Sequence, residues 1–150
     1  MSKTALVIIA DGIEEIEAIT PGDVLARAGV NVTVAGVGSL TPIGGHNIPM
    51  RAEMLVEDVG EILFDAIVIP GGGKGAENLH KSEWVNDAIK RHWEGGKIVA
   101  AICASPVVVL QPTGILNGKH ATCFPGMERR FAPEVKAVDT EVCVDGRLIT

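Results

Sequence analysis

A cysteine at the end of a buried apolar run is the residue best suited to chemistry in this sequence. Cys103 follows the stretch 98–102 and precedes Ser105 and Pro106, and proline is well tolerated in the first turn of a helix. A hydrolase nucleophile elbow lies at such a sharp strand-to-helix turn. The positive N-terminal end of the following helix would point at the sulfur and favour thiolate over thiol. We therefore interpret Cys103 as a nucleophile. The alternative is a buried cysteine that acts as a small hydrophobic residue.

A thiolate nucleophile needs a proton partner, and three glutamates follow the first apolar run. Glu14, Glu15 and Glu17 fall at the same end of the predicted sheet as Cys103. Glu14 and Glu17 are three residues apart and share a helical face, whereas Glu15 points elsewhere. Any of them could merely complement a helix dipole, and one could donate a hydrogen bond to the thiolate when protonated. The sequence alone does not choose among them.

Histidine is the usual partner of a catalytic cysteine, but none of the four histidines is well placed. We expect His92 near the polar end of a helix and in solvent, His80 in a loop and His46 at an inserted hairpin. His120 lies near a strand end, where side-chain alternation puts it on the face opposite Cys123. A Cys–His dyad, and with it an intracellular cysteine peptidase, is therefore the less favoured interpretation.

The glycine-rich stretch 71–75 matches neither nucleotide-binding pattern. The residue three after Gly75 is Asn78, so the dinucleotide fingerprint fails, and Lys74 is followed by glycine where a P-loop has Ser or Thr. What remains is a loop whose backbone amides can approach a ligand closely, or a simple tight turn. We expect no cofactor. We also expect no metal, because the three cysteines form no Cys-x-x-Cys pattern.

Alternating strands and helices must position these residues. The pattern predicts strands at 4–10, 31–37, 66–69, 98–102 and 119–124, and helices at about 15–28, 83–93 and from 105 onward. Continuous apolar strands that alternate with helices are typical of a parallel sheet covered on both faces. We therefore predict an α/β, flavodoxin-like doubly wound fold with a mostly parallel sheet, helices on both faces and a nucleophile elbow. Ligands bind such folds beyond the carboxyl ends of the strands.

Glycine and proline predict the breaks between these elements. Pro21 and Gly22 should break or kink the first helix. Gly44-Gly45 should turn an inserted hairpin within 39–56, and Asp145-Gly146 should turn a second hairpin between 141–144 and 147–150.

Composition fits a single domain over residues 1–150. Hydrophobic residues make up 47% and aromatic residues 3%, which excludes a disordered chain and indicates an aliphatic core. The net charge of −6 gives no direct sign of nucleic-acid binding. The longest apolar stretch, 98–110, is interrupted and too short to cross a membrane, and no signal peptide is recognisable. We expect a cytoplasmic protein that handles small molecules or acts on other proteins.

Three motifs, in the correct order and each at a strand end, resemble one family. They are Asp11-Gly12-Ile13-Glu14-Glu15-Ile16-Glu17, Val68-Ile69-Pro70-Gly71-Gly72 and Ala101-Ile102-Cys103-Ala104-Ser105-Pro106. Over essentially its whole length the chain is similar to the ThiJ/PfpI superfamily, and most of all to its parkinsonism-associated deglycase branch. The resemblance implies that Cys103 is the reactive cysteine and Glu17 the acid that hydrogen-bonds it. It also implies that the amides of Gly72 and Ala104 form an oxyanion-type pocket.

The same resemblance implies an activity and partners. The activity is detoxification of glyoxal or methylglyoxal, or removal of early glycation adducts, so the partner is a small dicarbonyl or a glycated protein or nucleotide. Redox sensing or chaperone activity through oxidation of Cys103, without turnover, is the alternative. A homodimer is also implied, with Asp23 and Arg27 at or near its contact.

The sequence departs from the family pattern in two places. Cys123 stands where many members have a histidine, so Glu17 would carry more of the proton transfer. Cys123 is then either a small residue that lines the pocket or a resolving thiol that forms a disulfide with Cys103. The family also continues past the strand 147–150 with closing helices. We therefore expect that this chain lacks a C-terminal segment, which could be a separate partner, and that apolar surface such as Leu148 is open.

Overall fold

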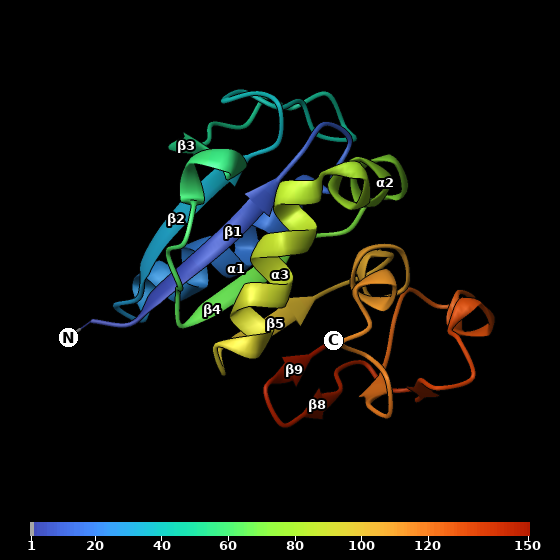
Figure 1. The fold of residues 1–150 in the computed structure, drawn as a ribbon. Coiled ribbons are helices and arrows are strands. Elements are labelled where there is room, and N and C mark those ends of the chain that lie inside the picture. The colour runs from blue at the N-terminus through green and yellow to red at the C-terminus, as the bar shows by residue number, and fades with distance from the viewer. Residues whose placement is uncertain (1) are drawn as a thin grey trace.

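The computed structural model describes residues 2–150, and its central element is a sheet that is parallel except at one edge (Figure 1). In these residues the sheet has seven strands in the order β3-β2-β1-β4-β5-β9-β8, and only β8 runs antiparallel to its neighbour. A separate parallel pair joins β6 to β7. The main strands are β1 Thr4–Ile9, β2 Asn31–Gly36, β3 Met54–Leu55, β4 Ala66–Ile69, β5 Ile98–Ala101, β8 Val144–Asp145 and β9 Leu148–Ile149; the separate pair is β6 His120–Ala121 and β7 Lys136–Ala137.

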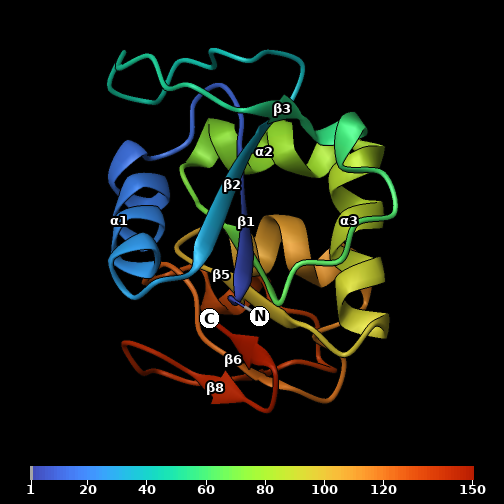
Figure 2. The ribbon, with the colours of Figure 1, turned by 90° about the vertical axis from the view of Figure 1, so that its left-hand side faces the viewer.

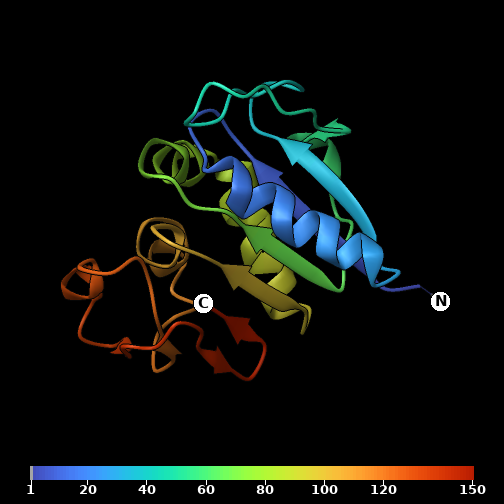
Figure 3. The same ribbon diagram turned by 180° about the vertical axis from the view of Figure 1, so that it is seen from behind.

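Helices cover both faces of this sheet, which confirms the predicted α/β fold class. Figure 2 shows helix α1 on one side of the strands and α3 on the other, and Figure 3 shows α1 lying across the sheet from behind. The helices are α1 Glu15–Arg27, α2 Gly73–Lys81 and α3 Glu83–Glu94, and the short turns are η1 Val56–Val59, η2 Pro106–Leu110, η3 Gln111–Thr113 and η4 Glu128–Arg130. Of these, η2 is a single π-helical turn. Within residues 2–150, no helix combines the length and the apolar character needed to cross a bilayer.

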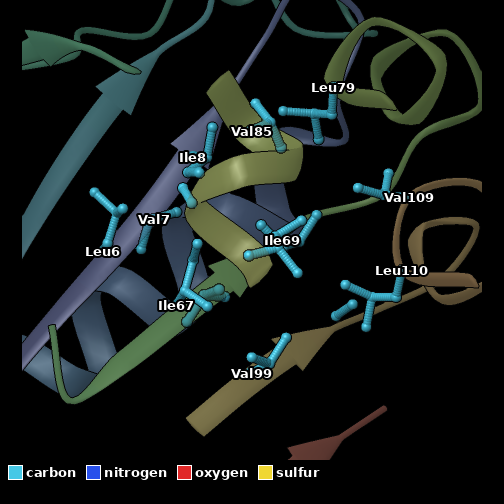
Figure 4. Packing of buried hydrophobic residues seen from close by; sticks show 14 of the residues in the cluster. Leu6, Val7, Ile8, Ile67, Ile69, Leu79, Val85, Val99, Val109 and Leu110 are labelled. Carbon is cyan, nitrogen blue, oxygen red and sulfur yellow. The ribbon is translucent and has the colours of Figure 1, made fainter. Parts of the chain in front are cut away.

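The core is aliphatic and lies where the strands meet the helices. Leu6 and Ile8 of β1 and Ile67 and Ile69 of β4 are fully buried (Figure 4). They pack in the same cluster as Leu79 of α2, from the glycine-rich segment. Burying such side chains contributes roughly 1.5–3 kcal/mol each, so this cluster fixes the carboxyl ends of the strands, where the candidate site lies.

Helix α1 runs unbroken through Pro21, so of the predicted break or kink the break is wrong. Proline removes one backbone hydrogen bond, and the buried Ala18 shows that packing holds this helix to the sheet. Helix α2 was not predicted. It begins at Gly73, inside the glycine-rich stretch, and includes His80, which was expected in a loop. Glycine is a poor helix former, yet Gly75 is required because a Cβ there would lie 2.4 Å from the backbone of Ile13.

Burial reverses two further expectations. His92 is completely buried in α3 rather than solvated: its Nε2 accepts from the Phe64 amide at 3.0 Å and its Nδ1 lies 2.7 Å from the Ala88 carbonyl. Leu148, expected to be open, is also fully buried, because β9 inserts beside β5 and pairs Leu148 with Val99. The exposed apolar residues of this region are instead Val142 and, on the edge strand β8, Val144.

The turns differ from the prediction in detail. Asp145 pairs with Leu148, so the two turn residues of the last hairpin are Gly146 and Arg147, one position later than expected. The inserted segment turns between Gly44 and Asn47 and carries a single antiparallel bridge rather than a ladder. The predicted strand 119–124 is reduced to β6, outside the main sheet.

Candidate active site

Cys103 occupies the strained turn that the sequence predicts. It follows the end of β5 at Ala101 and has a φ of 62°, which non-glycine residues rarely adopt. Ser105 fixes this turn, because its fully buried hydroxyl donates to the Pro70 carbonyl at 2.6 Å. The elbow is thus tied to the end of the neighbouring strand β4. Backbone strain of this kind persists only when surrounding contacts over-determine it, and it is concentrated at functional sites.

Glu17 is the glutamate that the structure brings to the sulfur. It lies in the first turn of α1, and its Oε2 accepts from the Gly71 amide at 2.8 Å. The same carboxyl group lies beside the Cys103 thiol, close enough for a side-chain hydrogen bond to shift the pKa of both groups. Glu15, in contrast, turns toward the inserted segment, where its Oε2 meets His46 Nδ1 at 2.9 Å. Tertiary packing therefore makes the choice that the sequence left open.

The pKa values of the cysteine and the glutamate are both raised, in each case mainly by burial. Burial raises the pKa of the Cys103 thiol, the amides of Gly72 and Ala104 lower it in part, and the negative charge of Glu17 raises it again. Burial also raises the pKa of Glu17, against the opposing effect of the Gly71 amide. The expectation that the helix end would favour a preformed thiolate is therefore wrong in its net direction. Burial and the charge of Glu17 therefore both disfavour a thiolate at Cys103.

Backbone amides converge on the sulfur from two elements. The amides of Gly72, at the start of α2, and Ala104, directly after the elbow, lie close enough to the Cys103 sulfur to lower its pKa. Gly72 adopts a φ of 92°, and a Cβ there would lie 2.7 Å from the Gly12 carbonyl. These two amides are the groups for which the family resemblance implies an oxyanion-type pocket. Donors held in this way can stabilise negative charge that develops on a bound carbonyl.

A cavity of about 350 Å³ opens beside the sulfur, and Glu17, Cys103 and Cys123 are among the residues that line it. The segment that contains Cys123 is held beside Cys103 because the amide of the next residue, Phe124, donates to the Cys103 carbonyl at 2.7 Å. Burial, aided by the charge of Glu128, raises the pKa of Cys123 to about 11, so this thiol stays protonated at neutral pH. The described residues that line the cavity include no histidine.

Other polar groups lie outside this cavity. Glu14, Glu15 and His46 form the group of three potential metal ligands in the described part of the chain, with ligand atoms within 4.8 Å of one another. Sequence analysis missed it because His46 lies 31 residues after Glu15 and no short motif links them. Asp23 and Arg27 form an exposed ion pair of 2.8 Å on α1.

Comparison with known proteins places this geometry in a family. The DJ-1/PfpI family model matches residues 3–150. Protein DJ-1 homolog B of Arabidopsis thaliana is 42% identical over 97% of this chain, which spans only 33% of that relative's length. Protein dj-1beta of Drosophila melanogaster is 39% identical over 100% of this chain and 81% of the relative. A Pyrococcus abyssi protein named a deglycase is 32% identical over 97% of this chain and 87% of its own length.

Solved structures agree with the sequence comparison. Drosophila melanogaster DJ-1beta superposes with a TM-score of 0.95 at 38% identity, over 99% of this chain and 81% of that one. Oxidised Toxoplasma gondii DJ-1 superposes with a TM-score of 0.93 at 36% identity, over 99% and 80% of the two chains. The family model spans Glu17, the glycine-rich segment and the turn at Cys103. This chain therefore belongs to the DJ-1/PfpI family.

Proposed function

We propose that this chain is a cysteine-dependent, cofactor-free enzyme that acts on glyoxal and methylglyoxal, or on their early adducts with proteins or nucleotides. It would thus be a glyoxalase III-type lyase or a deglycase with a role in carbonyl or oxidative stress. The observation that carries this proposal is the Glu17 carboxyl group held between the Gly71 amide and the Cys103 thiol. The relative named a deglycase supports an activity of this class.

The first step is attack on the aldehyde. Glu17 accepts the thiol proton as the Cys103 sulfur adds to the aldehyde carbon of methylglyoxal, and the C=O bond becomes an oxyanion. The amides of Gly72 and Ala104 hold that oxyanion; in other enzymes one such donor is worth about 3–4 kcal/mol. Glu17 then returns the proton to the oxyanion and gives a neutral hemithioacetal. A carboxyl group with a raised pKa suits this exchange in both directions.

The second stage is an internal oxidation and reduction that needs no added electron carrier. The aldehyde carbon of the hemithioacetal loses its hydrogen and becomes a thioester, while the adjacent ketone gains hydrogen and becomes an alcohol. Water then cleaves the thioester and releases lactate and the free thiol, so the sum is methylglyoxal plus water to lactate. With a glycation adduct as substrate, the repaired amine leaves in addition.

The decisive experiment measures lactate formed from methylglyoxal by the wild type and by matched variants. Cys103→Ser should abolish turnover, and Glu17→Gln should lower kcat/KM by about 10²–10⁴-fold, the usual range for a positioned acid–base group. Cys143→Ser is the matched control, because Cys143 lies in the last hairpin and outside the cavity beside the sulfur. Lactate formation retained by Cys103→Ser would refute the assignment.

A redox-sensing or chaperone role without turnover is the second candidate. The amides that would hold an oxyanion can equally hold the oxygens of a Cys103 sulfinate, with Glu17 as a further partner. Intact mass after dilute peroxide separates the two roles. A gain of two oxygens on Cys103, in a protein that forms no lactate, favours the redox role; rapid lactate formation by the reduced protein favours the enzyme.

We also propose a cytoplasmic homodimer. Helix α1 presents the exposed apolar residues Ile16, Ile19 and Val24 together with the Asp23–Arg27 ion pair, a mixture suited to a contact between copies. Light scattering after gel filtration should give twice the chain mass of 15.7 kDa. A monomer at micromolar concentration would contradict this assembly.

A further inference from the structure

We propose that Glu14, Glu15 and His46 form a binding site for a divalent transition-metal ion of the zinc type. The three ligand atoms come from two segments, the start of α1 and the inserted turn, which meet beyond the carboxyl end of β1. None of the three residues lines the cavity beside Cys103. The site is therefore an addition to the proposed cysteine chemistry and not a part of it.

The spacing of the ligand atoms suits a small tetrahedral ion. His46 Nδ1 lies 2.9 Å from Glu15 Oε2 and 3.5 Å from Glu14 Oε2. Zinc bonds of 2.0–2.2 Å in tetrahedral geometry separate neighbouring ligand atoms by about 3.4 Å. The Glu14 contact already has this separation, and the Glu15 contact needs to open by about 0.5 Å. An ion between the three atoms would take the place of the proton on Nδ1.

Glu15 is oriented for this task by the backbone. Its Oε1 accepts from the amides of His46 at 2.8 Å and Ile48 at 3.4 Å, which leaves Oε2 free to face the imidazole ring. Hydrogen bonds to the second oxygen fix a carboxylate ligand and improve its affinity for metal. The carboxyl group is nearly buried, so it holds one position.

Backbone hydrogen bonds hold the inserted turn, which carries His46, against the segment that precedes α1, so the three ligand residues keep their relative positions. Gly45 donates to the Ile13 carbonyl at 2.8 Å, and Gly12 donates to the Ile43 carbonyl at 2.8 Å. Gly44 lets the turn lie directly on the carboxylate, since a Cβ there would lie 2.2 Å from Glu15 Oε1. His46 and Glu15 are thus brought together by a rigid backbone frame rather than by a flexible side-chain contact.

Charge and access also favour a cation. Among the described ion pairs, Glu14 and Glu15 pair only with His46, so two carboxylates face one imidazole without a lysine or arginine between them. The side chain of His46 is 68% exposed, which gives an ion an entry path. All three residues also line a hollow of about 410 Å³ together with Ile19 and Ile48. A fourth coordination position can therefore hold water or a ligand oxygen.

Metal titration of the chelator-treated protein tests this proposal. Calorimetry with Zn²⁺ should give one saturable site per chain, and Co²⁺ should give visible bands without a thiolate-to-cobalt charge-transfer band, because the ligands are nitrogen and oxygen. His46→Ala should abolish the site, and Glu14→Gln should weaken it at least ten-fold. The His46 substitution leaves the main-chain amides that bind Glu15 in place.

His120→Ala is the matched control. His120 forms the other exposed histidine–carboxylate contact, 3.1 Å from Asp145, but its neighbour there is Lys119 in place of a second carboxylate. Its removal should leave zinc binding unchanged. No saturable binding by the wild type, unchanged binding by His46→Ala, or a cobalt spectrum with thiolate charge transfer would each overturn the proposal.

Discussion

Gly71 and Cys103 are in such close contact that no side chain fits between them: a Cβ on Gly71 would lie 2.6 Å from the Cys103 Cβ. The same added atom would lie 2.7 Å from Glu17 Oε2. Cys103 and Glu17 are thus packed against bare backbone, whose amide also donates to the Glu17 carboxylate. The glycine-rich segment serves this site by its lack of side chains.

Gly71→Ala is expected to lower the free energy of unfolding by about 1–3 kcal/mol, the usual cost of overpacking, and to reduce lactate formation. Urea denaturation and the methylglyoxal assay measure the two effects. Gly22→Ala in α1 is the control, because a Cβ there meets nothing within 4 Å. It should raise stability by about 0.4–1 kcal/mol. Equal effects of the two substitutions would contradict the packing argument.

His92→Leu should cost about 1–3 kcal/mol, because the Phe64 amide loses its buried acceptor. Burial lowers the pKa of His92 below its ordinary value of 6.5, so the unfolded chain takes up the proton first. Wild-type stability should therefore fall as pH drops below about 6.5, and the variant should lack that part of the slope. Urea unfolding at several pH values between 7.5 and 5.5 checks this; parallel curves would refute it.

Asp145→Asn should flatten the acid end of the stability profile. Hydrogen bonds lower the pKa of Asp145 from 3.8 to about 2; the largest contribution comes from the His120 backbone amide, followed by the His120 ring and Lys119. A depressed carboxyl pKa contributes stability above 3.8 that is lost as pH falls from 3.8 toward 2. Thermal melts across that window should show a smaller loss in the variant than in the wild type. The same loss in both would show that this carboxylate does not stabilise the hairpin.

Cys123→His should add a proton carrier to the cavity beside Cys103. The Cys123 thiol, with a pKa of about 11, cannot exchange protons near neutrality, whereas an imidazole titrates near 6.5. We expect kcat for methylglyoxal to rise and its pH profile to gain a limb between about pH 6 and 7. Cys143→His serves as the control outside the cavity. Identical pH profiles for the wild type and Cys123→His would rule out a relay at position 123.

The strands and the reactive turn could be predicted because both depend on local sequence. The apolar runs predicted at 4–10, 66–69 and 98–102 contain the neighbouring parallel strands β1, β4 and β5. The turn at Cys103 follows from its position between such a run and Pro106. The two segments with glycine or proline were misjudged: α1 continues through Pro21, and α2 begins at Gly73. Local propensity costs about 1–3 kcal/mol at such residues, and packing against the sheet outweighs it.

The fold class, the sharp turn at Cys103 and the edge of the sheet that carries the candidate site could be predicted from the sequence, since hydrophobic periodicity and a strand-to-helix turn are local properties. Which of the three glutamates meets the sulfur depends on how the helices pack on the sheet. Glu17 reaches it because α1 docks beside the end of β4, where the Gly71 amide fixes the carboxyl group. Long-range packing likewise buried His92, raised the pKa of Cys103 and brought His46 to Glu15. Such pairings join residues that are distant in the chain, and spacing along the sequence carries no record of them.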